Sequence, residues 1–153
     1  MKLGEALRLR SDNYKKIAEL RTRAVASAQT QEGAEAPPDD PAALLDTIER
    51  LWAETLVLVQ RINRTNVVTV LPSGQRLVEA LGERDYLLGV RTPYEAVAEA
   101  ASAVQPRYMR SEIRIVRTVD AIALRKKADE YARRHRLLDV QIQEVNWSTD
   151  LVE

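Results

Sequence analysis

The chain has 153 residues, in which 23 Lys and Arg balance 23 Asp and Glu, so no net charge is available to attract nucleic acid or anionic lipid. It contains no Cys, which excludes disulfides, thiolate catalysis and Cys-based metal sites. Hydrophobic residues make up 45% of the chain but aromatic residues only 5%, a balance that favours helices over a β-sandwich. We find neither a signal sequence nor an apolar run of about 18 residues, and therefore expect a cytoplasmic protein that does not span a membrane.

The first predicted helix covers residues 2–28. Apolar residues gather on one of its faces, interrupted by Arg10 and Arg21, while Lys and Arg dominate the polar face. This amphipathic pattern is typical of a helix packed in a bundle. The segment 29–40 that follows is polar and acidic and contains Gly33, which predicts a loop.

The second predicted helix covers residues 41–66. Asp40 is a suitable N-cap, and Pro41 stands at the first helical position, where its missing N–H costs nothing. Apolar residues repeat at alternating steps of four and three, and further apolar residues, Trp52 among them, widen the stripe. A stripe this wide should contact more than one neighbour, so we expect the chain to form a homo-oligomer.

Two segments have the pattern of β-structure. The β-branched run after Asn66 and the turn at Pro72-Ser73-Gly74 predict a short hairpin over residues 67–78. Residues 108–119 are rich in β-branched side chains and alternate in part with Arg, which predicts a strand that adds to this hairpin.

The remaining two helices are expected over residues 77–103 and 120–146. Pro93 predicts a kink or break in the first of them near 91–93, where a threonine cap would allow the helix to restart. In the second, Leu124, Ala128, Tyr131, His135, Leu138, Ile142 and Val145 form a heptad-like seam. His135 on this seam is either a polar core residue that fixes the register or a group that titrates within an interface. The candidate interface residues are Trp52, Tyr131, His135, Leu138 and Ile142.

These elements predict a mainly α fold in a single domain over residues 1–153. We expect an antiparallel long-helix bundle or coiled coil of about four helices, with a small β-hairpin or sheet at one end.

Four segments resemble an uncharacterised bacterial family that is often labelled septicolysin-like. They are residues 1–7, residues 61–66, residues 110–114 together with 118–120, and residues 143–147, and together they span nearly the whole chain. The resemblance implies a helical fold with a small β element. It implies no activity, because no catalytic residues are established for the family.

An arginine cluster is the first candidate for a binding site. Arg61 and Arg64 stand one turn apart at the end of a predicted helix, and the 108–119 segment adds further arginines. Such residues could bind phosphate or an RNA backbone, although basic residues also favour helix C-termini and charges protect edge strands. The candidate anion-binding residues are Arg61, Arg64, Arg110, Arg114 and Arg117.

Paired carboxylates are the second candidate. Glu79 with Glu83, and Glu95 with Glu99, stand four residues apart and could contribute to a divalent-metal site, but a solvated helix face has the same pattern. We predict no catalytic, cofactor-binding or metal residues.

The leading prediction is therefore a non-enzymatic oligomeric helical scaffold or protein-binding module. An RNA- or phosphate-binding module that uses the arginine cluster is the alternative, and a metal-dependent hydrolase is the second alternative. Salt-dependent RNA binding would favour the former, and bound metal in purified protein the latter.

Overall fold

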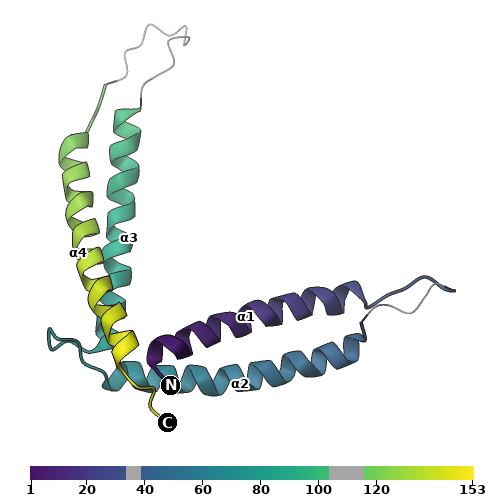
Figure 1. Ribbon diagram of the computed structural model, residues 1–153. Helices are drawn as coiled ribbons and strands as arrows, with labels where there is room; N and C mark the ends of the chain where they lie inside the picture. Colours follow the sequence, from purple (N-terminus) through teal and green to yellow (C-terminus); the bar gives the residue numbers. More distant parts are fainter. Residues whose placement is uncertain (34–38, 104–115) are drawn as a thin grey trace, which may run out of the picture. The chain divides into compact units, whose positions relative to one another are not determined.

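The computed structural model describes residues 1–33, 39–103 and 116–153, and these ranges hold four helices (Figure 1). They are α1 (Leu3–Ala26), α2 (Pro41–Val68), α3 (Leu77–Ser102) and α4 (Ala121–Ser148). The chain divides into two compact units. Unit 1 contains Met1–Thr69 and Glu144–Glu153, and unit 2 contains Val70–Gln143.

Helices α1 and α2 form an antiparallel hairpin in unit 1 (Figure 1). The start of α1 is fixed by Glu5, whose carboxylate accepts a hydrogen bond of 2.7 Å from the backbone N–H of Lys2. The start of α2 is fixed by Asp40, whose carboxylate accepts one of 2.9 Å from the N–H of Ala42. The two helices bury a shared face that consists of Leu3, Ala6, Ile17, Leu20 and Ala24 from α1 and Thr55, Leu58, Ile62 and Thr65 from α2.

The predicted hairpin over residues 67–78 is wrong. Val67 and Val68 continue α2, while Leu77 and Val78 begin α3. The short connection between the helices contains a turn, in which the N–H of Leu71 donates to the carbonyl of Gln75 at 2.8 Å, and Val70 and Arg76 form one isolated bridge. The β propensity of branched residues is weak, and here an already formed helix overrides it.

The predicted strand over residues 108–119 adds no sheet to the described fold. Residues 108–115 lie outside the described ranges, and residues 116–119 have no strand structure. Within the described residues the fold is therefore helical throughout, and the predicted β-hairpin or sheet at one end is not present.

We expected a kink or a break at 91–93, and helix α3 runs through Pro93 without a break. A proline removes one backbone N–H, here the one that would donate to the carbonyl of Gly89. Neighbouring contacts hold the same turn. The hydroxyl of Thr92 donates to the carbonyl of Leu88 at 3.0 Å, and Arg91 forms an ion pair of 2.8 Å with Glu95.

In unit 2, α3 lies beside the first part of α4 (Figure 1). The rings of Tyr94 and Tyr131 pack with their centroids 5.9 Å apart. Two ion pairs also join these helices, Arg84 to Asp139 at 3.8 Å and Arg134 to Glu83 at 3.7 Å. The carboxylate of Asp120 caps α4 by accepting from the N–H groups of Ile122 and Ala123 at 2.9 and 3.1 Å.

The last residues of the chain return to the α1–α2 hairpin within unit 1. The N–H of Leu3 donates to the carbonyl of Thr149 at 3.0 Å, and the N–H of Leu151 donates to the carbonyl of Met1 at 2.9 Å. The N–H of Val152 donates to the buried hydroxyl of Thr65 at 3.0 Å. We call this region, defined by Leu3, Gly4, Ile62, Thr65 and residues 147–152, the closed end.

Candidate protein-binding surface

An open groove of about 570 Å³ lies between α1 and α2. We call it the α1–α2 groove. It is lined by Tyr14, Ile17, Ala18 and Arg21 from α1 and by Leu45, Ile48 and Trp52 from α2. Apart from Arg21 these side chains are apolar or aromatic, so the groove is a hydrophobic depression on unit 1.

The groove exists because the apolar face of α2 is wider than the surface that α1 covers. Thr55, Leu58 and Ile62 are buried, whereas Leu45, Trp52 and Leu56 are 58%, 50% and 58% exposed. The exposed three are spaced by seven and four residues and so share one face of the helix. They form a second apolar stripe beside the buried one.

Two aromatic residues, one from each helix, form the wall of the groove. The ring centroids of Tyr14 and Trp52 lie 5.6 Å apart in a tilted arrangement. Both side chains stay substantially exposed. Tyr and Trp are the residue types that most often dominate binding energy at protein interfaces, since each can bury a large rigid surface.

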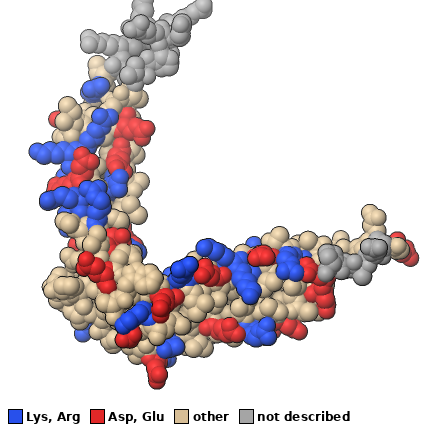
Figure 2. All heavy atoms as spheres, viewed as in Figure 1, with Lys and Arg blue, Asp and Glu red and all other residues tan. Residues whose placement is uncertain are grey.

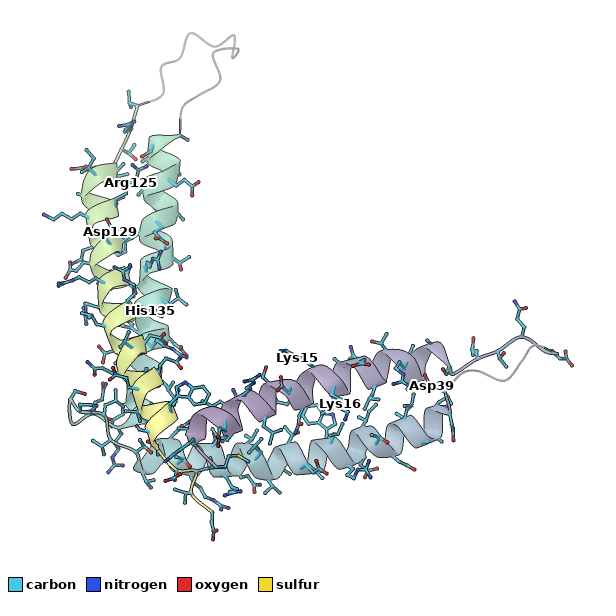
Figure 3. All side chains as sticks on the ribbon, in the orientation of Figure 1. Lys15, Lys16, Asp39, Arg125, Asp129 and His135 are labelled. Atoms are coloured by element: carbon cyan, nitrogen blue, oxygen red, sulfur yellow. The ribbon has the colours of Figure 1, made fainter. Side chains whose placement is uncertain are left out.

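Polar contacts below and beside the groove keep the two helices in register. The amide of Asn13 donates to the hydroxyl of Thr55 at 3.0 Å, and that hydroxyl donates to the carbonyl of Leu51. Asp39 lies at the end of the hairpin where α2 begins (Figure 3). The guanidinium of Arg23 binds both of its carboxylate oxygens, with 3.0 Å between Nε and Oδ2. This hydrogen-bonded ion pair lowers the pKa of Asp39 and raises the pKa of Arg23.

Comparison with known proteins assigns the chain to a family. Residues 10–151 match DUF6847, a family of unknown function. The chain belongs to this family. It is also similar to a crystal structure of a functionally unknown conserved protein from Corynebacterium diphtheriae, with 43% sequence identity, a TM-score of 0.92 and 99% of each chain covered. No curated protein matches the chain.

Membership of DUF6847 confirms that the chain comes from an uncharacterised family. Neither name mentions a septicolysin, so that part of the resemblance is not confirmed. Across the described ranges, none of the helices combines the length and the apolar character needed to cross a membrane.

The candidate interface residues occupy different environments in this DUF6847 chain. Trp52 lies at the α1–α2 groove and is half exposed. Tyr131, His135 and Leu138 are partly exposed on α4, on which Figure 3 marks His135. Ile142 is fully buried, so its surface already belongs to the core of the chain.

The arginines of the candidate anion site are not brought together by the described structure. The Nε of Arg61 donates to the carbonyl of Val152 at 3.0 Å, and Nη1 of Arg64 donates to the carbonyl of Glu153 at 3.3 Å. These two side chains therefore hold the C-terminal segment at the closed end. Arg117 is exposed outside any helix, while Arg110 and Arg114 lie outside the described residues.

Most of the paired carboxylates contact other groups of the chain. Glu79 accepts from the N–H of Arg76 at 3.2 Å, Glu83 accepts from Gln75 and pairs with Arg134, and Glu95 pairs with Arg91. No group of three or more His, Asp or Glu in the described part of the chain could hold a metal ion. The described residues thus offer helix caps and ion pairs at these positions.

Sequence reasoning named Trp52 and the widened stripe of α2, but it did not identify the groove as a site. Arg21 is the clearest omission, since it stood out only as an interruption of an apolar face. A basic residue within an otherwise apolar face is the signal that could have marked it.

Proposed function

We propose that the chain is a non-enzymatic, cytoplasmic helical scaffold that works by binding protein, and that it self-associates through the α1–α2 groove. One observation carries this proposal. Leu45, Trp52 and Leu56 lie on one face of α2, and each of these three apolar side chains is at least half exposed. A contiguous apolar patch rimmed by polar residues is typical of a protein-binding surface.

The energetic case rests on the size of these side chains. Full burial of a large apolar side chain contributes about 1.5–3 kcal/mol relative to exposure. Covering the stripe together with Tyr14 therefore offers several kcal/mol, which can offset the entropy lost on association. A small ligand is less well suited, because small-molecule sites enclose most of the ligand surface and this groove is open.

A cytoplasmic location forms part of the proposal. A chain without Cys gains nothing from an oxidising compartment. No contact described above favours the phosphate-binding or hydrolase alternatives, since Arg61 and Arg64 bind carbonyls of the chain and three of the four candidate carboxylates contact other groups.

The experiment is light scattering coupled to size-exclusion chromatography at micromolar concentration. We expect the unaltered chain to be an oligomer and Trp52→Asp to be a monomer with unchanged helix content by circular dichroism. Val57→Asp is the matched control, because Val57 is 57% exposed on α2 but does not line the groove. A monomeric unaltered chain, or equal oligomers in all three samples, would contradict the proposal.

A further inference from the structure

We infer that the α1–α2 groove is covered by the same groove of a second copy, with α1 of each protomer lying over α2 of its partner. This inference rests on the proposed self-association and adds its geometry. The two copies are related by a two-fold axis parallel to the hairpin helices. The contact is isologous, so every interaction in it occurs twice.

The shape of unit 1 provides the first support. Two antiparallel helices with an apolar groove on one side are half of a four-helix arrangement. An identical pair of helices completes such an arrangement, because its own groove exposes the same kinds of side chain. Tyr14, Ile17 and Ala18 of one copy then pack against Leu45, Ile48 and Trp52 of the other.

Charge selects the partner helix. Helix α1 carries six Lys and Arg against three Asp and Glu, and Figure 2 shows basic side chains along it with acidic ones between them. The first half of α2, residues 41–54, carries three acidic residues against one basic residue. Placing α1 over the partner's α2 pairs opposite charges, whereas placing α1 over the partner's α1 pairs like charges and is disfavoured.

Two side chains define the register of the contact. Arg21 lines the groove on α1, and Glu49 falls on the exposed stripe of α2, since residues 45, 49, 52 and 56 share one face. Neither side chain forms an ion pair with any other described residue. Each is therefore available to a partner.

The levels of these residues along the hairpin agree with this pairing. Tyr14 is level with Trp52, because their rings are in contact. Seven residues along α1 lead to Arg21 and seven residues back along α2 lead to Leu45, and both steps are about 10 Å long. Rotation about an axis parallel to the helices leaves the position of each residue along the helix direction unchanged. Arg21 thus lies opposite the turn of the partner's α2 between Leu45 and Glu49, within reach of the carboxylate.

The test is a reciprocal charge exchange measured by sedimentation equilibrium. Arg21→Glu and Glu49→Arg each replace two attractive pairs by two repulsive ones, and we expect each to weaken dimerisation by at least about tenfold. The double variant Arg21→Glu/Glu49→Arg should dimerise within about threefold of the unaltered chain. An equimolar mixture of the two single variants should form a heterodimer, because both of its pairs are attractive.

Lys16→Glu and Glu54→Arg are the matched controls. They make the same charge changes on the same helices. Lys16 does not line the groove, and Glu54 lies neither in the groove nor on the face shared by residues 45, 49, 52 and 56, so both variants should leave the dissociation constant within about threefold. Single exchanges that behave like these controls, or a double variant that stays dissociated, would overturn the Arg21–Glu49 pairing while leaving self-association intact. An unaltered chain that stays monomeric at micromolar concentration would overturn the proposed function itself.

Discussion

The closed end and the α1–α2 groove are built from the same two helices but differ in what covers them. At the closed end, Ile62 and Thr65 of α2 are almost completely buried, and Trp147 lies so near Gly4 that a Cβ there would meet its ring at 2.8 Å. Along the groove, Leu45 and Trp52 of the same helix are at least half exposed.

The difference shows that a two-helix hairpin cannot bury the wide apolar face of α2 unaided. At the closed end, the C-terminal segment adds a third layer and supplies hydrogen-bond partners for a buried hydroxyl. Along the groove the described chain supplies no equivalent layer. Conservative substitutions should therefore destabilise the fold at the closed end and change association at the groove.

The largest expected effect is that of truncating a buried side chain at the closed end. Ile62→Ala should lower the free energy of unfolding by about 2–5 kcal/mol, because it leaves a cavity where the side chain is now enclosed. Leu45→Ala at the groove should change it by no more than about 0.5 kcal/mol in the monomer. Urea unfolding of both variants at low protein concentration makes the comparison, and equal losses would refute the contrast between the two regions.

A smaller effect is expected from the buried hydroxyl of Thr65. It donates to the carbonyl of Arg61 at 2.8 Å and accepts from the N–H of Val152. Thr65→Val keeps the shape but leaves that N–H without its partner, which should cost about 1–3 kcal/mol of stability.

Thr47→Val is the control for this substitution. Among the described contacts, the hydroxyl of Thr47 makes a single hydrogen bond. It donates to the carbonyl of Ala43 in the preceding turn of its own helix. We expect a change within about 0.5 kcal/mol there. Hydrogen exchange of the Val152 amide should be faster in Thr65→Val than in the unaltered chain, and unchanged in Thr47→Val. The same exchange rate in both variants would contradict the hydrogen bond from Val152 to Thr65.

The smallest expected effect is the dependence of stability on pH. It should be similar at the two ends of the hairpin, the closed end and the end where α2 begins. Hydrogen bonds and ion pairing from Arg23 lower the pKa of Asp39, and those from Lys2 lower the pKa of Asp150 at the closed end. Since each folded pKa lies below the unfolded value of about 3.9, the unfolded chain binds more protons as the pH falls. The stabilisation is therefore complete above about pH 4 and is lost as the pH falls through the folded pKa.

Unfolding of Asp39→Asn and Asp150→Asn between pH 7 and pH 2 measures these contributions. Each variant should lose stability less steeply than the unaltered chain below about pH 4, with little difference at pH 7 because both ion pairs are at least partly exposed to solvent, which screens them. A variant whose decline in acid parallels that of the unaltered chain would show that its ion pair contributes nothing.

Local signals in the sequence predicted much of the helical fold. The caps at Asp40 and Asp120 marked the starts of α2 and α4, and the apolar periodicity marked their lengths to within a few residues. The predicted hairpin failed because Val67 and Val68 are compatible with either a strand or a continuing helix, and propensity cannot decide between them.

The α1–α2 groove was harder to predict from the sequence than the helices were, because its position depends on which face of α1 packs against which face of α2. The width of the stripe around Trp52 predicted a second contact but not which helix would border it. Arg61 and Arg64, one helical turn apart, had the pattern of an anion site. Their hydrogen-bond acceptors are instead backbone carbonyls about 90 residues further along the chain. Contacts of such separation leave no periodic signal.

The hydrogen bond from Leu151 to Met1 has a consequence for the order of events during synthesis. A nascent chain emerges from its N-terminus, so α1 and α2 are made well before residues 147–152 exist. Until those residues emerge, the hydroxyl of Thr65 and the surface of Gly4 remain uncovered, as the groove is. The hairpin therefore passes through a stage with two uncovered surfaces, the groove and the future closed end.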